Sequence, residues 1–166
     1  MKFKINDYIM YGTMGVCEVI DIEKEIERKN NPKEYYVLRL VYSRNVIIKI
    51  PVDNEKISMR KIHTRDEIAS LIKEIPNKEI IWIEDDRKRS EQFKAMIKTS
   101  DCESLIAIIR SIYLDKKNKK LQGKKMYKGD EEIMQTAEKL LNEEFATILN
   151  ISLEEVGSYI STHVSQ

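Results

Sequence analysis

The N-terminal third of the chain is built of short apolar runs separated by turn-forming residues. The runs 16–26, 35–42 and 45–52 are rich in Val, Ile, Leu and Tyr, and the first of them alternates well enough for a strand with one buried face. Turn signals fall at 11–15, around Asn30 and at 42–45. This pattern predicts about five strands in residues 1–63, arranged as a small, strongly bent sheet or barrel.

After His63 the apolar residues follow helical spacing. Three S/T-x-x-E capping boxes, at Thr64, Ser100 and Ser152, predict three helix starts. Two further helices are expected over 86–98 and 129–149. One face of the last carries Ile133, Ala137, Leu140, Leu141 and Phe145. Residues 64–166 are therefore expected to form an all-α bundle, which makes the whole chain α+β.

Composition favours a protein that folds around a core. Of its 166 residues, 34% are charged and 42% hydrophobic. No apolar run approaches the roughly 18 residues of a membrane span, and the first residues lack the features of a secretory signal, so we expect a cytoplasmic protein. Cys17 and Cys102 lie far apart without metal-ligand spacing and are expected to be buried small hydrophobes. No catalytic grouping or metal motif emerges, so an enzyme is the least supported class.

The net charge of +1 conceals an uneven distribution of charge. Residues 87–128 hold thirteen Lys or Arg against four acids, whereas residues 130–155 hold eight acids against one lysine. The segment 115–129 is rich in lysine, contains two glycines and is expected to be a mobile loop. Its lysines allow two interpretations, a solvated loop or a set of contacts to phosphates.

The only tryptophan, Trp82, precedes three acids and then the basic triplet Arg87, Lys88 and Arg89. Successive helix positions fan out, so the three cations cannot all face one partner. From the residue type alone, Trp82 is either a core residue that caps the bundle or an exposed recognition residue.

The stretches "FKINDYIMYGTMGV" (3–16) and "IPVDN" (50–54), taken together with two stretches of the helical half, resemble motifs of the CarD/CdnL family of bacterial transcription regulators. The family pattern F-x-x-G-D-x-V-x-Y-x-x-x-G-V near the start, and V-P-V-D-N before the helical half, have close counterparts here. The glycine before Asp7 is replaced by Asn6, which also tolerates a left-handed turn. In the helical half, "SDCESLIAIIRSIY" and "YKGDEEIMQTAEKLLNEE" resemble further family motifs, so the resemblance covers roughly residues 2–148. The matching N-terminal positions are Phe3, Asp7, Tyr11, Gly15, Val16, Pro51, Val52, Asp53 and Asn54.

This resemblance implies a Tudor/SH3-like domain over residues 1–63 that binds the lobe of the RNA polymerase β subunit. It also implies a helical domain over 64–166 that contacts promoter DNA at the upstream edge of the transcription bubble, without reading sequence. Family members stabilise the open complex of the housekeeping sigma holoenzyme, are not enzymes, use no cofactor and are found with polymerase at the nucleoid. The protein is therefore expected to shift the promoter-melting equilibrium by its differential affinity for the open state.

The expected DNA-contacting residues are Trp82, Arg87, Lys88, Arg89, Lys124 and Lys125. The resemblance implies the tryptophan and its basic neighbours, and the last two belong to the lysine-rich segment. In known members a tryptophan at the start of a bundle helix wedges into the minor groove. Alignment backward from "FKAMIKTSD" places that tryptophan nearest Asp85, three residues after Trp82. If a helix already includes Trp82, the three residues amount to about one turn, so the ring projects in the same direction as the family's tryptophan and can act as the wedge. If 80–86 is a loop, the indole packs and the cations alone contact DNA.

On the polymerase side, the family uses an edge strand and a basic residue before V-P. Lys49 occupies the basic position, and Pro51 is the proline of this motif. A second contact falls on Lys24 or Glu25, because the alignment with the family is ambiguous by one residue there. Strand edges carry unpaired main-chain groups that suit such docking. Two alternatives remain open: a polymerase-binding adaptor whose helical domain holds another protein, and a free-standing relative of the interaction domain of the transcription-repair coupling factor.

Overall fold

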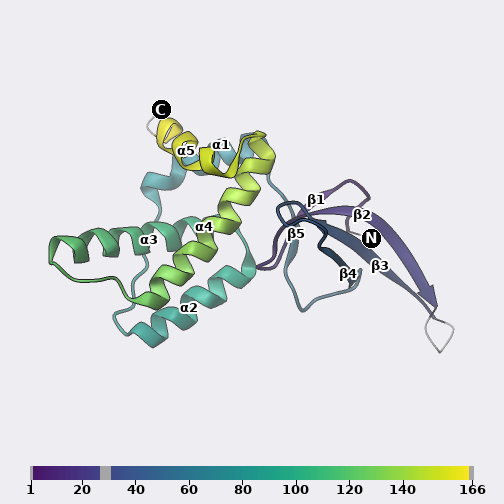
Figure 1. Ribbon diagram of the computed structural model, residues 1–166, viewed down its shortest axis with the longest axis horizontal. Coiled ribbons are helices and arrows are strands. Elements are labelled where there is room, and N and C mark those ends of the chain that lie inside the picture. The colour runs from purple at the N-terminus through teal and green to yellow at the C-terminus, as the bar shows by residue number, and fades with distance from the viewer. Residues whose placement is uncertain (1, 27–30, 165–166) are drawn as a thin grey trace. The chain divides into compact units, whose positions relative to one another are not determined.

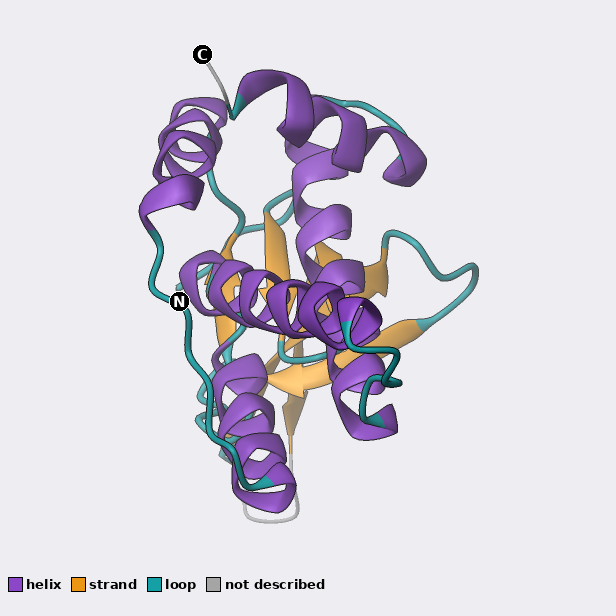
Figure 2. Ribbon diagram, turned by 90° about the vertical axis from the view of Figure 1, so that its left-hand side faces the viewer, coloured by secondary structure: helices purple, strands orange, loops and turns teal. Residues whose placement is uncertain are grey.

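The computed structural model describes residues 2–26 and 31–164, and the chain divides into two compact units, residues 1–62 and 63–166 (Figure 1). Among the described residues, the first unit holds the strands and the second holds the helices (Figure 2). The α+β class predicted from the sequence is confirmed.

The five strands of the first unit form one antiparallel sheet in the order β4-β3-β2-β1-β5. A register shift between Val19 and Asp21 marks a bulge, which bends the long hairpin of β2 and β3. Strands β4 and β5 are the two edges, and no pairing joins them in the described part of the chain. The expected barrel is therefore an open sheet. The strands are β1 (Tyr8–Tyr11), β2 (Gly15–Ile26), β3 (Pro32–Leu40), β4 (Ile47–Pro51) and β5 (Met59–Lys61).

Left-handed residues close the turns of the sheet where the sequence predicts them. Asn6, which replaces the family glycine, has φ 78°, and Asn45 in the β3–β4 turn has φ 61°. Gly12 has φ 48°, and a Cβ there would lie 2.7 Å from a methyl carbon of Ile57. The turn predicted around Asn30 falls partly on residues 27–30, which lie outside the described residues.

The core of this unit is formed by one face of the sheet. The Tyr36 hydroxyl accepts the main-chain N–H of Phe3 at 3.1 Å, and the two rings lie 5.6 Å apart, so the N-terminal segment is fixed against the sheet. Asn54 donates to the Ile57 carbonyl at 3.0 Å and thereby shapes the loop before β5. The buried cluster comprises Phe3, Ile9, Tyr11, Cys17, Val19, Tyr36, Leu38 and Leu40.

The second unit is a helical bundle in which α4 packs against α1, α2, α3 and α5. The predicted apolar face of α4, from Ile133 to Phe145, is buried. The helices are α1 (Arg65–Glu74), η1 (Ile75–Asn77), α2 (Asp86–Thr99), α3 (Cys102–Leu121), α4 (Lys128–Leu149), η2 (Leu153–Glu155) and α5 (Val156–His163). In the part of the chain that is described, none of these helices has the length and apolar character needed to cross a bilayer.

Two of the three predicted capping boxes are confirmed, at Thr64 and at Ser152, where η2 leads into α5. The box at Ser100 is wrong by one residue. Asp101 is the N-cap of α3 and accepts the Ser104 N–H at 2.8 Å. Ser100 instead ends α2 in the left-handed conformation, with φ 59°. Aspartate and serine are about equally good N-caps, so residue type does not decide between them. Because Ser100 is the C-cap of α2, the N-cap of α3 falls on Asp101.

The lysine-rich segment is mostly helical, which corrects the expectation of a loop over 115–129. Helix α3 continues to Leu121 because lysine and asparagine do not interrupt a helix strongly, and it ends just before Gly123, which has φ 70°. Only residues 122–127 connect α3 to α4. Both cysteines are buried, as predicted. Cys102 is not simply a small hydrophobe, however, because its Sγ lies 3.1 Å from Glu144 Oε1.

Candidate functional site

Strand β4 offers an open edge in the first unit, since among the described strands it pairs with β3 alone. Two hydrogen bonds fix which of its main-chain groups face β3. The Val46 carbonyl accepts the Leu40 N–H at 3.1 Å, and the Val52 N–H donates to the Glu34 carbonyl at 3.1 Å. Main-chain groups alternate in direction along an antiparallel strand, so residues at even positions of this segment face β3.

The odd positions, Ile47, Lys49 and Pro51, therefore direct their main-chain groups to the open edge. Ile47 and Lys49 each present an N–H and a carbonyl there, whereas Pro51 has no N–H and its carbonyl already accepts the Asn54 N–H at 3.0 Å. The edge thus has the donors and acceptors needed to add one short strand from a partner, and Pro51 ends the row of donors. Ile47 is 60% exposed beside it.

The Lys49 side chain lies on the solvent face of the sheet between two acids of β2. Its Nζ is 2.7 Å from Glu23 Oε2 and also pairs with Glu25, and it lies 5.5 Å from the Tyr35 ring centre. The hydrogen bonds to Glu23 and Glu25 raise the pKa of Lys49 above its usual value. The cation is therefore already compensated, which limits what an acidic partner gains from it.

The pairing of β2 with β3 distinguishes Lys24 from Glu25, the two candidates for the second polymerase contact. Glu25 pairs across to Lys33 and shares the solvent face with Lys49. Lys24 is the neighbouring residue on β2, so it points to the opposite face, where it lies 4.0 Å from Glu34. Lys24 and Lys49 therefore do not belong to one surface patch.

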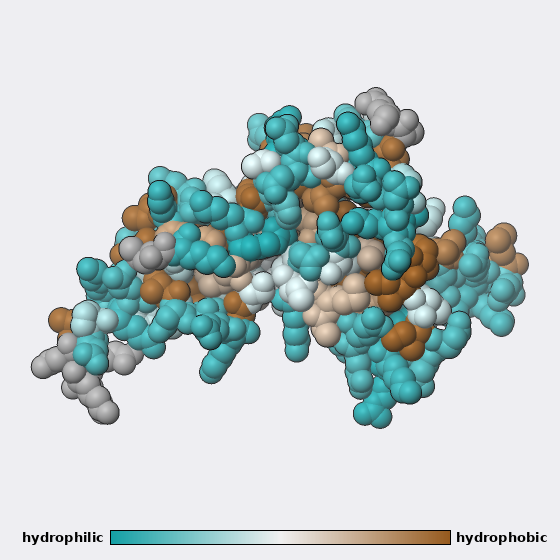
Figure 3. Space-filling view, turned by 180° about the vertical axis from the view of Figure 1, so that it is seen from behind, coloured by the Kyte–Doolittle hydropathy of each residue, from teal (hydrophilic) through white to brown (hydrophobic). Residues whose placement is uncertain are grey.

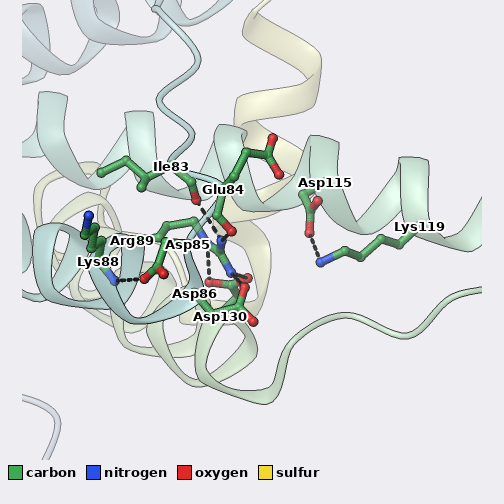
Figure 4. A network of polar contacts seen from close by, with 9 residues as sticks. All are labelled: Ile83, Glu84, Asp85, Asp86, Lys88, Arg89, Asp115, Lys119 and Asp130. Carbon is green, nitrogen blue, oxygen red and sulfur yellow. Dashed lines mark hydrogen bonds and ion pairs between the residues drawn. The ribbon is translucent and has the colours of Figure 1, made fainter.

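In the helical unit, Arg89 is buried and holds the starts of α2 and α4 together (Figure 4). Its Nε and Nη2 donate to the two carboxylate oxygens of Asp130, at 3.0 and 2.8 Å, in a bidentate pair. Nη2 also donates to Asp86 at 2.7 Å, and Nη1 donates to the carbonyls of Ile83 and Glu84, at 2.8 and 3.4 Å.

These contacts use all five N–H groups of the Arg89 guanidinium: one on Nε, two on Nη1 and two on Nη2. Burial alone lowers the pKa of Arg89, but the hydrogen bonds to Asp130 and Asp86 outweigh it, and the net pKa lies above the ordinary value. With 1% of its surface exposed, Arg89 has a structural role in this conformation and does not present a cation to DNA.

Trp82 lies in the irregular segment before α2 and packs on that helix. The Arg89 guanidinium carbon is 4.2 Å from the centre of its ring, and Phe93 meets it edge-on at 6.5 Å. Asp85, the position nearest the family's tryptophan, is the N-cap of α2 and accepts the Lys88 N–H at 2.9 Å. The indole is half-buried and lines a hollow of about 220 Å³ with Ile80.

Of the basic triplet, Arg87 and Lys88 remain at the surface. The side chain of Arg87 is 90% exposed, with Glu91 one turn away at 3.4 Å. Glu84, Asp85 and Asp86 are exposed beside them, so the start of α2 carries acids as well as cations. A DNA phosphate near the start of α2 would be attracted by the cations and repelled by the acids, so its net attraction to this surface is weak.

The more uniformly basic surface is the C-terminal half of α3 with the segment that follows it. Lys116, Lys117 and Lys120 are exposed on α3, and Lys124 and Lys125 are exposed in the connection to α4. Tyr113 and Leu121 lie on the same helix face, at 58% and 82% exposure, and line a hollow of about 670 Å³ with the three helical lysines. At the right of Figure 3, where α3 ends, hydrophobic side chains (brown) lie among hydrophilic ones (teal).

Sequence reasoning missed the partner of Arg89 and assigned this arginine to DNA. A signal was nevertheless present, since Arg89 is the last member of the triplet and falls one turn before the buried Phe93. Asp130 lies 41 residues away, in a motif that resembles the family's, and no local pattern pairs the two.

Comparison with known protein families identifies the first unit. Residues 3–63 match the model of the CarD-like/TRCF RID domain, an RNA polymerase-interacting domain. The match covers 61 of the 166 residues, which is the sheet unit. The sheet unit is therefore similar to this domain, whose family is one of protein-interaction domains. A search of curated proteins gave no match for the chain.

Proposed function

We propose that the protein is a transcription regulator that binds the lobe of the RNA polymerase β subunit and contacts promoter DNA at the upstream edge of the bubble. The observation that carries the proposal is the match of residues 3–63 to a polymerase-interacting domain, in a chain whose second unit presents a basic helix end. Binding the melted promoter more tightly than the closed one stabilises the open complex by that difference in affinity.

On the polymerase side, the open edge of β4 supports docking by strand addition. The outward N–H groups of Ile47 and Lys49 give main-chain hydrogen bonds, which do not depend on the partner's sequence. Because Lys49 is already paired with Glu23 and Glu25, its side chain adds orientation more than affinity.

On the DNA side, the basic end of α3 with Lys124 and Lys125 supports a phosphate-binding surface, joined by Arg87 and Lys88. Such contacts position a protein on the backbone without reading base sequence. Binding to DNA alone is expected to be weak and to fall steeply with salt. Arg89 and Trp82 support this surface from within, since together they fix the start of α2.

A photocrosslinking residue placed at Lys124 tests the DNA contact. In the open complex formed by the cognate holoenzyme, we expect crosslinks from position 124 to the upstream promoter strand. The matched control is Lys73, an exposed lysine on α1 that is expected to give none. Crosslinks from 124 to protein alone, with polymerase still bound, would contradict the DNA contact.

A second candidate is an adaptor that binds polymerase and holds another protein through its helical unit. Two observations favour it: Trp82 packs against Arg89 and does not project, and three acids flank the cations of α2. The adaptor requires no DNA contact, so the same crosslinking experiment separates the two functions.

A further inference from the structure

A second polar cluster of the helical unit shares no residue with either proposed surface. It consists of His63, Cys102 and Glu144, whose nitrogen, sulfur and oxygen atoms all lie within 4.8 Å of one another. His63 Nδ1 is 2.8 Å from Glu144 Oε2, Cys102 Sγ is 3.1 Å from Glu144 Oε1, and the sulfur is 3.7 Å from His63 Nδ1.

Three separate segments supply these side chains. His63 directly precedes the cap of α1, Cys102 is the first residue of α3, and Glu144 lies on α4 near its end. The Glu144 side chain is fully buried and Cys102 is 1% exposed, while the His63 side chain is 23% exposed. The main-chain N–H of His63 donates to Glu144 Oε2 at 2.9 Å and orients that carboxylate. A buried carboxylate and a buried thiol thus meet a partly exposed imidazole, which forms the outer side of the cluster.

The ligand types and spacings suit a tetrahedral metal ion. Zinc–ligand bonds of about 2.0–2.3 Å place the ligand atoms roughly 3.3–3.6 Å apart. The Cys102–His63 separation of 3.7 Å exceeds this range by about 0.1 Å, and the other two, at 3.1 and 2.8 Å, must widen by about 0.5 Å. The shorter separations are hydrogen bonds, whose protons a metal ion would displace.

An acidic hollow of about 410 Å³ leads to the exposed side of this cluster, and His63 forms part of its wall. Its lining includes four acids, Asp66, Glu67, Glu74 and Glu103, against one lysine, Lys78. Hydrogen bonds from Thr64 hold the pKa of Glu67 below its usual value, so this carboxylate stays charged. The hollow therefore attracts cations, and it gives them a route to the imidazole.

We propose that His63 Nδ1, Cys102 Sγ and a carboxylate oxygen of Glu144 bind a divalent transition-metal ion of the zinc type. The mixed nitrogen, sulfur and oxygen set favours zinc over magnesium or calcium, which prefer oxygen ligands alone. The fourth position faces the acidic hollow and holds water. The His63 N–H that orients Glu144 supports the site from outside the ligand set.

The bound ion ties the start of α1, the start of α3 and α4 to one centre. Binding requires the thiolate and the Nδ1 lone pair, so it releases protons and strengthens as pH rises. The site does not depend on the proposed function, because neither the β4 edge nor the lysines of α3 take part in it.

Cobalt(II) substitution in the purified full-length protein tests this site directly. We expect Co²⁺ to give a thiolate-to-metal charge-transfer band in the near ultraviolet and the visible bands of tetrahedral cobalt. Both should bleach when Zn²⁺ is added, and Zn²⁺ alone should raise the melting temperature. The charge-transfer band should disappear in Cys102→Ser and the tetrahedral bands should weaken in His63→Gln.

Cys17→Ser is the matched control, because Cys17 is the other buried thiol and lies in the sheet unit. It should leave the cobalt spectrum unchanged. If wild type with Co²⁺ shows no charge-transfer band and Zn²⁺ leaves its melting temperature unchanged, the cluster is a hydrogen-bonded triad only and the proposal fails. A spectrum that survives in Cys102→Ser would overturn it as well. The wild-type measurements need no variant to fold.

Discussion

A single buried arginine decides how the helical unit presents its cations. Arg89 has all five donors satisfied and stacks against the only tryptophan of the chain. Its neighbours Arg87 and Lys88 are also cations of the same helix, but their side chains leave the helix in other directions and both are exposed. A basic triplet in a helix therefore divides into one structural and two surface residues.

Removing the Arg89 cation should destabilise the helical unit strongly. In Arg89→Met, Asp130 is left as a buried charge without its partner, and such losses cost about 3–5 kcal/mol. Chemical denaturation followed by circular dichroism measures the change. Arg87→Ala is the control, since its exposed pair with Glu91 is worth at most about 0.5 kcal/mol. Equal effects of the two substitutions would contradict the structural role of Arg89.

Trp82 reports on its own packing, because it is the only tryptophan. We expect acrylamide to quench its fluorescence more efficiently in Arg89→Met, which loses the guanidinium that covers the ring, than in wild type or Arg87→Ala. Forked promoter DNA at low salt should leave the wild-type emission unchanged. Strong quenching by this DNA would instead show that the indole stacks on a base, as a wedge requires.

At the scale of elements, strand β4 and helix α3 carry the two proposed surfaces. Each is open on one side for a structural reason: β4 is the edge of the sheet, and α3 extends to Leu121 before it turns back. The proposed partners differ accordingly. A strand edge offers directional main-chain bonds, whereas a lysine-bearing helix end offers charge without direction.

The β4 edge predicts a difference between two substitutions of one residue. Lys49→Pro removes the outward N–H and should weaken polymerase binding about tenfold, since one main-chain bond is lost and the fold allows proline at an outward edge position. Lys49→Ala keeps that N–H and should weaken binding less, because the cation is already paired. Binding of labelled protein to core polymerase, with circular dichroism as the folding control, measures both. A larger loss in Lys49→Ala would show that the side chain carries the contact.

At the scale of the whole molecule, local patterns predicted the strands, the turns that lie in the described part of the chain and most helix boundaries. The Thr64 box and the Asn6 turn were predictable because each is decided by residues within one turn of the chain. The lysine-rich segment was wrongly predicted to be a loop. The exposed end of a helix has no apolar periodicity to mark it, so it is decided by the helix propensity of its residues.

The clusters that join distant segments were not predictable in this way. Arg89 meets Asp130 across 41 residues, and His63 meets Glu144 across 81. Likewise, the outward direction of Lys49 follows from the register of β4 on β3, which no single strand reveals. Resemblance to a family supplied the roles, but tertiary structure decides which residues are available for them.

The lifetime of the open complex on a linear promoter tests the central claim most directly. With the cognate holoenzyme, wild-type protein should lengthen this lifetime, and the triple variant Lys117→Gln/Lys124→Gln/Lys125→Gln should shorten it toward the protein-free value while still binding polymerase. Lys73→Gln, a change of one exposed lysine on α1, should behave as wild type. An unchanged lifetime with wild-type protein that is bound to polymerase would contradict the proposed function and leave the adaptor.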